Sequence, residues 1–213
     1  MGPLIEQSIV IVGAGGHALA CIDVIREEGS YEIVGLFGRR EELGKSIDGA
    51  KVVGTDEDLS VLGKRIASAA LVAVGQIHTP DNRIRIFNIL QAQDFALPSI
   101  VSPRAYLSRS ATLGRSTLLL HGAIVNAGAE IGVNCIINSR ALIEHGALIG
   151  DHCHISTAAV VNGDAVVGDG SFVGSGAVIR EGVTIGRRCV IGMGALVQHN
   201  LPDGAVFYGK STV

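Results

Sequence analysis

Aliphatic residues recur at every sixth position through the second half of this chain. The series contains only Leu, Ile or Val, and it runs without interruption from Val101 through Leu107 and Leu113 to Val197. The residue four positions after each of them is small in nearly every repeat. A period of six fits neither an α-helix nor a simple alternating strand, whose side chains repeat every 3.6 and every 2 residues. Hexapeptide repeats are typical of a parallel β-helix.

The repeat predicts a three-sided coil. Each hexapeptide is expected to form one short strand and one corner, with the aliphatic side chain inside and the small residue where the chain turns. Three strands make a coil of about eighteen residues, and successive coils stack at a spacing of about 4.8 Å. Cys135, Cys153 and Cys189 occupy the small position in one stacked column that also contains Ser171. We expect these cysteines to be buried free thiols that fill the core.

The first half of the chain has a different pattern, in which apolar runs alternate with helical segments. The expected strands are Ser8–Val12, Glu32–Leu36 and Ala69–Val74, and the expected helices are Ala18–Glu28, Leu59–Ile66 and Asn82–Gln93. Alternating strands and helices predict a small Rossmann-like parallel sheet. We therefore expect an α/β domain over residues 1–99 and the β-helix over residues 100–213.

A glycine-rich segment lies between the first expected strand and the first expected helix. Residues 13–18 read Gly-Ala-Gly-Gly-His-Ala and fit the pattern G-x-G-x-x-A of a phosphate-binding loop. Fewer than about 100 residues is short for a complete dinucleotide-binding fold, so a single nucleotide-sugar fits better. Arg39 and Arg40, after the second expected strand, either contact a phosphate or form a solvated turn.

Composition narrows the choice of partners. The chain has 17 basic and 20 acidic residues, evenly mixed, for a net charge of −3, so we expect no nucleic-acid binding. It has no long apolar run, so we expect no membrane span. The first residues, MGPLIEQS, do not resemble a secretory signal, and together with the free thiols they lead us to expect a cytoplasmic protein.

A second motif supplies a resemblance to a known family. Residues 137–145 read INSRALIEH, and residues 149–154 read IGDHCH. With the glycine loop and the uninterrupted repeat, this chain resembles the hexapeptide-repeat sugar acyltransferases, which include bacillosamine and perosamine N-acetyltransferases and sialic acid O-acetyltransferases. The resemblance covers essentially the whole chain. It implies a left-handed coil, a homotrimer, and acetyl-CoA bound in the groove between neighbouring β-helices.

The resemblance also implies roles for individual residues. His145 maps to the catalytic histidine, and His154 to a histidine that contacts acetyl-CoA. The sugar nucleotide would bind Gly15, Gly16 and His17, with Gly75 nearby, and further contacts to acetyl-CoA would come from Ser175 and Met193. Glu144 is a candidate to orient the His145 ring or a plain surface residue, and Asn138 is a candidate to hydrogen-bond either substrate or to cap stacked turns.

Two positions depart from the bacillosamine-type pattern. Those enzymes carry an acidic residue after the catalytic histidine, where this chain has Gly146. They also carry an acidic pair after the second strand, where this chain has Phe37 and Gly38. The second departure makes a GDP-sugar such as GDP-perosamine a candidate substrate beside UDP-sugars.

The chemistry that we expect is transfer of an acetyl group from acetyl-CoA to the amino group of a nucleotide-linked 4-amino-deoxy sugar, for surface glycan synthesis. The alternative is O-acetylation of the sialic acid O-acetyltransferase type. A γ-type carbonic anhydrase would need two zinc-binding histidines five residues apart, but residue 150 is glycine, so we expect no metal. A third alternative is a nucleotide-sensing scaffold without activity, which the retained Ile-Glu-His segment argues against.

Overall fold

The computed structural model describes residues 7–209 and divides the chain into two compact units. The first unit comprises residues up to 75 together with residues 81–102, and the second comprises residues 76–80 together with residues from 103 onward. The first six residues, which belong to the segment MGPLIEQS, lie outside the described residues. Within residues 7–209, no helix combines the length and the apolar character that crossing a membrane requires.

The first unit is a five-stranded α/β sheet. Its strands are β1 (Gln7–Val12), β2 (Tyr31–Gly38), β3 (Ser46–Ile47), β4 (Ala50–Thr55) and β5 (Ala69–Val72), in the order β3-β4-β2-β1-β5. The strands from β4 to β5 pair in parallel, which confirms the expected Rossmann-like sheet, whereas β3 pairs antiparallel with β4. Strands β3 and β4 were not expected from the sequence. Residues 9–12 of β1 are fully buried at the centre.

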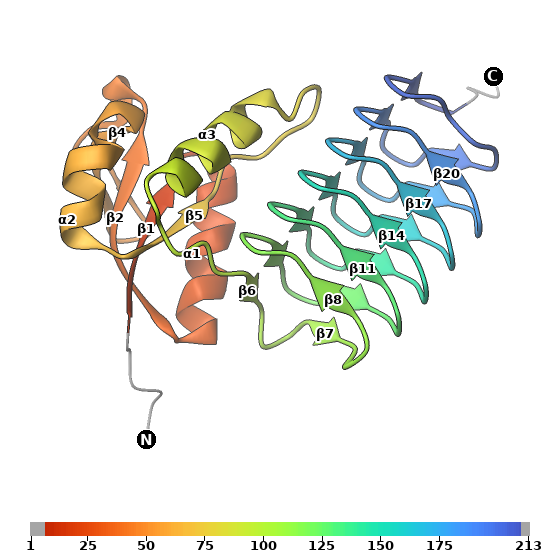
Figure 1. The fold of residues 1–213 in the computed structure, drawn as a ribbon, viewed down its shortest axis with the longest axis horizontal. Coiled ribbons are helices and arrows are strands. Elements are labelled where there is room, and N and C mark those ends of the chain that lie inside the picture. The colour runs from red at the N-terminus through yellow and green to blue at the C-terminus, as the bar shows by residue number, and fades with distance from the viewer. Residues whose placement is uncertain (1–6, 210–213) are drawn as a thin grey trace. The chain divides into compact units, whose positions relative to one another are not determined.

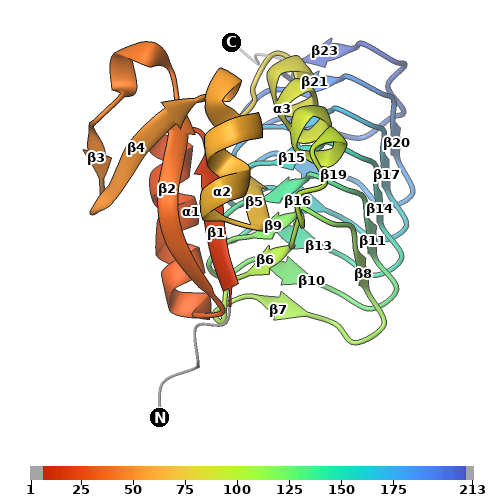
Figure 2. The same ribbon diagram turned by 60° about the vertical axis from the view of Figure 1, so that its left-hand side comes forward.

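Helices cover both faces of this sheet. They are α1 (Gly16–Glu28), α2 (Lys64–Ile66) and α3 (Asp81–Ala92), with single turns at Arg40–Glu42, Asp56–Asp58 and Leu59–Gly63. The views in Figures 1 and 2 show α1 and α2 on opposite faces. The turn at Leu59–Gly63 is π-helical and continues into α2, so the expected helix over residues 59–66 is present in an irregular form. Strand β6 (Ile100–Val101) follows as the last element of the unit.

The second unit is a left-handed parallel β-helix of two-residue strands. One face consists of β7 (Tyr106–Leu107), β10 (Ile124–Val125), β13 (Leu142–Ile143), β16 (Val160–Val161), β19 (Val178–Ile179) and β22 (Leu196–Val197). The next face consists of β8 (Thr112–Leu113), β11 (Glu130–Ile131), β14 (Leu148–Ile149), β17 (Val166–Val167) and β20 (Thr184–Ile185). The third face contains β9 (Leu118–Leu119), β12 (Ile136–Ile137), β15 (His154–Ile155), β18 (Phe172–Val173), β21 (Val190–Ile191) and β23 (Val206–Phe207).

Strand pairing follows the predicted stacking of one coil on the next. Ile124 pairs with Leu142, eighteen residues further on, and Leu142 pairs with Val160. Backbone hydrogen bonds join the coils, as from the Ile124 N–H to the Ala141 carbonyl at 2.9 Å. The second residue of each strand points inward, and Val125 and Ile143 are fully buried.

The corners from Ser116 to Gly194 share one backbone conformation. In each of them, the residue three positions after the inward aliphatic residue has a left-handed φ, which is 64° at Gly146, 58° at Asp164 and 67° at Gly182. Glycine adopts this conformation without steric cost, and Asn and Asp tolerate it better than most residues. The conformation turns the chain by the same amount at each corner, so the strands of successive coils stay in register.

The column of small residues makes a repeated hydrogen bond as well as filling the core. The Cys135 thiol donates to the Gly150 carbonyl at 3.1 Å, and the Ser171 hydroxyl donates to the Gly186 carbonyl at 2.9 Å. Cys153 and Cys189 make the same contact at 3.2 Å. Cys135, Cys153 and Cys189 are free and buried, as expected, and so is Cys21. Burial raises the pKa of the Cys153 thiol.

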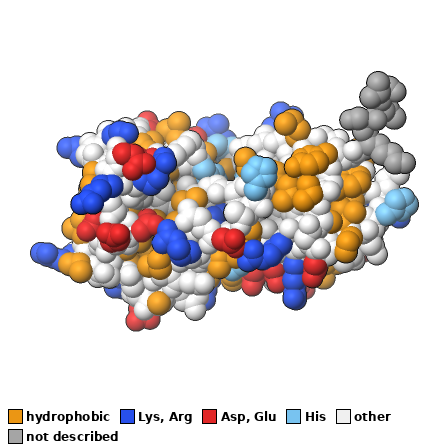
Figure 3. Space-filling view, turned by 90° about the horizontal axis from the view of Figure 1, so that it is seen from above, with side chains coloured by type: hydrophobic (Ala, Val, Ile, Leu, Met, Phe, Trp, Pro, Cys, Tyr) orange, Lys and Arg blue, Asp and Glu red, His pale blue; other side chains and the backbone are white. Residues whose placement is uncertain are grey.

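Charged side chains are mixed on the surface. On the face shown in Figure 3, basic and acidic side chains are interspersed, and apolar side chains gather over the coils. Within residues 7–209, no group of three or more His, Cys, Asp or Glu side chains is arranged to hold a metal ion.

Candidate active site

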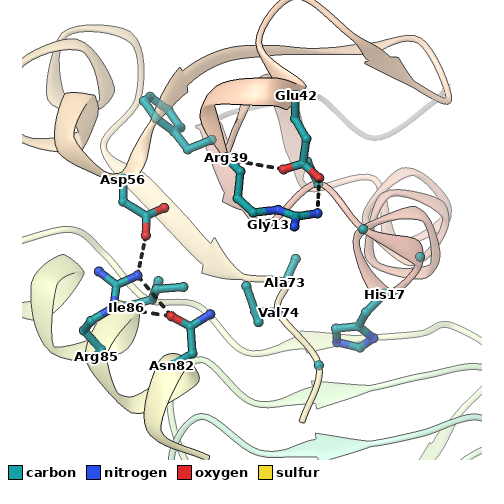
Figure 4. Close-up of a pocket in the computed structure, with 16 residues that line it drawn as sticks. Gly13, His17, Arg39, Glu42, Asp56, Ala73, Val74, Asn82, Arg85 and Ile86 are labelled. Carbon is teal, nitrogen blue, oxygen red and sulfur yellow. Dashed lines mark hydrogen bonds and ion pairs between the residues drawn. The ribbon is translucent and has the colours of Figure 1, made fainter.

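A cavity of about 680 Å³ opens at the carboxyl ends of the parallel strands in the first unit. Its wall includes the loop after β1, the end of β2 and the loop after β5 (Figure 4). This edge of a parallel sheet is where open α/β folds bind ligands, because the loops there are free to diverge. The cavity volume lies in the range of small-molecule sites.

The glycine loop forms one side of this cavity. Gly15 is the N-cap of α1, and a Cβ added at Gly15 or Gly16 would meet nothing within 4 Å. The lack of side chains therefore keeps the space in front of the helix open. His17, half-buried on the first turn of α1, packs against Gly75, whose added Cβ would lie 3.8 Å from the His17 Cβ. The structure thus brings together the four residues predicted to bind the sugar nucleotide.

An acidic side chain reaches the end of β2 from four residues further along the chain. A Cβ at Gly38 would lie 2.8 Å from Oε2 of Glu42, so this carboxylate borders the position where the acidic pair of the bacillosamine-type pattern is missing. The Arg39 backbone N–H donates to Glu42 at 2.8 Å, and its guanidinium donates at 3.0 Å. These bonds, the backbone one first, lower the pKa of Glu42. The sequence motif gave no sign of this residue.

A second polar group lies on the opposite wall. The Arg85 guanidinium, on α3, pairs with the Asp56 carboxylate and donates to the Asn82 side chain at 3.0 Å (Figure 4). Both arginines of the cavity are thus already paired with carboxylates. Arg39 is the member of the predicted Arg39–Arg40 pair that lines the cavity, whereas Arg40 does not line it.

In the second unit, His145 is exposed at the corner between β13 and β14. The Glu144 carboxylate accepts a hydrogen bond from the His145 backbone N–H at 3.2 Å. This contact fixes the turn rather than the imidazole ring. The ring itself lies against the backbone of Gly163 in the next coil, because a Cβ added there would lie only 2.6 Å from its Cε1 atom.

The buried His154 on the third face forms a polar pair with Asn138, which is half-buried. The Asn138 Oδ1 accepts from the Ser139 N–H at 2.7 Å, so its Nδ2 donates to His154 Nε2 at 3.2 Å. His154 Nδ1 therefore carries the proton and donates to the Gln76 carbonyl at 2.8 Å. The Phe172 ring meets the imidazole edge-on at 5.2 Å. These contacts fix the orientation of the His154 ring.

Ser175 and Met193 lie on the corner between the third and first faces. Ser175 shares a hydrogen bond of 2.9 Å with Ser156, and Met193 is 83% exposed. His145 lies on the next corner, beyond strand β13. Within one chain, the structure therefore brings Asn138 and His154 together but leaves His145 on a separate corner.

A shallow groove of about 540 Å³ follows the second face, beginning just after the His145 corner. Strands β11, β14 and β17 line it, together with the glycines that follow the strands, such as Gly150 and Gly168. A Cβ at Gly168 would lie 2.7 Å from the backbone of the next coil, so glycine is required for the coils to stack closely here. None of the residues predicted for the site lines this groove.

Comparisons with known proteins agree with both units. Residues 8–90 match the family model of the PglD N-terminal domain, and residues 164–199 match that of the bacterial transferase hexapeptide (six repeats). A search of curated protein sequences gives no significant match.

Several solved structures are similar along nearly the full length. A histidine-to-asparagine mutant of perosamine N-acetyltransferase from Caulobacter crescentus, in complex with CoA and GDP-perosamine, is 31% identical, with 93% of this chain and 92% of that chain covered and a TM-score of 0.88. The acetyltransferase domain of PglB from Neisseria gonorrhoeae, in complex with acetyl coenzyme A, is 27% identical, with coverage of 94% and 95% and a TM-score of 0.84. WeeI from Acinetobacter baumannii, at 20% identity and a TM-score of 0.79, shares the fold.

The α/β unit with its glycine-loop cavity, followed by a β-helix with a histidine at its corner, defines an acyltransferase of the hexapeptide-repeat class. The chain belongs to the hexapeptide-repeat sugar acyltransferases, the family that includes the perosamine and bacillosamine N-acetyltransferases. The resemblance seen in the sequence is therefore confirmed.

Proposed function

We propose that this enzyme transfers the acetyl group of acetyl-CoA to the amino group of a nucleotide-linked 4-amino-deoxy sugar. The observation that carries the proposal is the 31% identity over 93% of the chain to an N-acetyltransferase crystallised with CoA and GDP-perosamine. A GDP-sugar such as GDP-perosamine is the first candidate substrate, and a UDP-sugar is the second. Such a reaction would serve surface glycan synthesis.

In the proposed reaction, His145 is the general base. The neutral amine attacks the thioester carbonyl, so that a C–N bond forms and the C–S bond then breaks. His145 takes the proton that the nitrogen loses and delivers it to the departing CoA sulfur. An imidazole accepts and releases protons near neutral pH, which suits both steps. Its exposure at a corner leaves the ring accessible to both substrates.

We assign the sugar nucleotide to the cavity of the first unit. Gly15 and Gly16 leave the space before α1 open, and Gly15 has no side chain to occupy the first N–H groups of the helix. The N–H groups at the start of a helix and the helix dipole favour a diphosphate there. His17 and Gly75 border the same space and would contact the phosphates or the sugar.

We assign acetyl-CoA to the β-helix. The groove of the second face begins at the His145 corner, and its length along the coils suits an extended pantetheine chain. Ser175 and Met193 lie on a different corner, so they would reach the same acetyl-CoA from a neighbouring copy. Asn138 and His154 would support that wall, because the hydrogen bond between them and the bond from His154 to the Gln76 carbonyl fix both side chains.

A homotrimer would bring these corners together. The outward residues of the first face form an unbroken apolar row: Tyr106, Ile124, Leu142, Val160, Val178 and Leu196. All six are at least partly exposed in one copy, and Leu196 is 61% exposed. Contiguous exposed apolar surface of this kind marks protein interfaces. We propose that this face packs against neighbouring copies, with His145 at its edge.

The test is a screen of GDP- and UDP-linked 4-amino sugars with acetyl-CoA, detecting the released thiol and the mass of the product. We expect turnover with at least one amino sugar and an increase of one acetyl group on its nitrogen. Turnover of hydroxyl acceptors alone would replace N-acetylation with the O-acetyl alternative. Failure of all acceptors would contradict the proposal.

A further inference from the structure

One corner position lacks a side chain in the coil that follows His145. The residue two positions after each inward aliphatic residue carries a side chain at every corner from Pro103 to His199 except at Gly163. Gly163 comes eighteen residues after His145, so the two residues are stacked in adjacent coils. Ala127, eighteen residues before His145, shows that this column accepts a Cβ elsewhere.

The missing side chain leaves the space that the imidazole occupies. A Cβ at Gly163 would lie 2.6 Å from Cε1, 2.8 Å from Nε2 and 3.2 Å from Nδ1 of His145. Two of these separations are shorter than real Cβ contacts. The ring therefore lies directly on the Gly163 backbone, in a position that alanine at residue 163 would forbid.

The residues that follow, Gly146 and Asp164, are arranged in the reverse way: here the glycine is in the coil of His145 and the side chain is in the next coil. A Cβ added at Gly146 would overlap Oδ1 of Asp164, so the Asp164 carboxylate fills the space that Gly146 leaves. The Asp164 N–H also donates to the His145 carbonyl at 3.0 Å. Asp164 has a left-handed φ of 58°, a conformation that Gly128, Gly146 and Gly182 adopt in the same column. An aspartate thus stands where glycine would be less strained.

We propose that Gly163 and Asp164 position the catalytic imidazole. Gly163 gives the His145 ring a flat surface to rest on, and Asp164 closes the adjacent space over Gly146 with a carboxylate. The exposed ring is thereby held in one orientation before substrates bind. The inference rests on the proposed function, because it assigns the two residues a role toward the proposed general base.

Gly163 allows a clean test because its own backbone is not strained. Its φ is outside the left-handed region, so alanine can adopt the same backbone conformation. The three atoms nearest to the added Cβ all belong to the His145 ring, which is at the end of an exposed side chain and can rotate away. Gly163→Ala should therefore leave the fold intact and move the ring.

We expect Gly163→Ala to lower kcat by roughly 10- to 100-fold, because small displacements of a catalytic group have effects of this size. The KM values for both substrates should stay within about twofold, since the variant alters neither assigned binding surface. The melting temperature should be unchanged or higher. Ala127→Gly is the matched control, because it changes the same column by one methyl group in the preceding coil, and it should keep the wild-type kcat.

The position of the ring is measured independently of activity. A crystal structure of Gly163→Ala should show the imidazole rotated away from residue 163. A wild-type ring position together with a wild-type kcat would overturn the proposal. If His145→Ala abolishes turnover while Gly163→Ala does not, the positioning role is wrong and the proposed function stands. If the wild-type enzyme acetylates no amino sugar, the proposed function fails, and the crystal structure still decides whether Gly163 sets the ring position.

The role of Asp164 is tested by Asp164→Gly, which removes the side chain and adopts the left-handed conformation without strain. We expect kcat to fall roughly threefold or more at unchanged KM, since the space over Gly146 beside the base is left open. A wild-type kcat in Asp164→Gly would overturn the part of the proposal assigned to Asp164.

Discussion

His145 is exposed at a corner, and its surroundings are built from residues eighteen positions away rather than from its sequence neighbours. The Glu144 carboxylate accepts from the backbone N–H of the turn, and the ring lies on Gly163. The residue that determines the ring position is therefore in the next coil.

Removing the imidazole tests the assigned base. We expect His145→Ala to lower kcat by about 10²- to 10⁴-fold, the usual contribution of a general base. Release of CoA thiol at saturating substrates measures the loss. His199→Ala is the control, because His199 is an exposed histidine in the same corner column, and it should retain full activity. Near-wild-type turnover of His145→Ala would show that another group takes the proton.

Only part of the candidate site could be predicted from the sequence. His145, Asn138 and His154 were proposed as site residues through a family motif, since nothing in the hexapeptide period distinguishes one corner residue from another. The register did contain a signal for Gly163, as the lone glycine in its column, but its meaning depends on the ring stacked against it. Gln76 gave no signal, because its contact with His154 joins segments 78 residues apart.

At the scale of elements, the glycine loop and the start of α1 together border the cavity proposed for the sugar nucleotide. Gly16 begins the helix, and a Cβ there would enter the cavity without touching protein atoms. We expect Gly16→Ala to raise the KM for the sugar nucleotide roughly tenfold, equivalent to about 1.4 kcal/mol. The KM for acetyl-CoA should not change, and the melting temperature should be equal or higher, because alanine favours the helix. An unchanged KM for the sugar nucleotide would show that the ligand does not bind at the glycine loop.

Helix α1 also contains Cys21, a thiol whose pKa is strongly raised. Burial raises the pKa of Cys21 to about 12, and the nearby Arg83 charge opposes the shift only in part. The unfolded chain therefore loses this proton near pH 9 while the folded chain keeps it. Stability from this group is complete below pH 9 and declines as the pH rises toward 12.

We expect the free energy of unfolding to fall between pH 9 and 11, with Cys21 contributing up to about 1.4 kcal/mol per pH unit. Urea titrations at several pH values measure the slope. Cys21→Ala should have a shallower slope than the wild type, although Cys153 still contributes. Equal slopes in the two proteins would contradict the assignment.

The elements were predictable where their patterns were regular. Strands β1, β2 and β5 are continuous apolar runs, and α1 and α3 have clear boundaries. The hairpin of β3 and β4 was missed because the residues of β4 do not follow its alternation of buried and exposed positions: Val53 is apolar but exposed, and the buried Gly54 has no side chain. Its turn, Asp48-Gly49, has positive φ at both residues and is a recognised hairpin signal that could have revealed it.

For the whole molecule, the apolar first face predicts the assembly state. Val160→Glu places a charge in the middle of the proposed interface, where burying it would cost several kcal/mol. We expect the variant to sediment as a monomer and to lose activity, whereas the wild type sediments as a trimer. Val61→Glu is the control, because Val61 is an exposed apolar residue of the α/β unit and is not part of this face, and it should remain trimeric. A wild-type protein that sediments as a monomer would contradict the trimer.

The division of each coil into three equal sides limits which insertions and deletions the molecule can accept. Loss of six residues after β14 would turn every later strand onto the neighbouring side and carry Ser175 and Met193 away from their corner. Loss of eighteen residues would shorten the stack by one coil and keep each remaining side chain pointing in its original direction. Length changes in such a chain should therefore come in whole coils, and genes that encode longer or shorter versions should differ by multiples of fifty-four nucleotides.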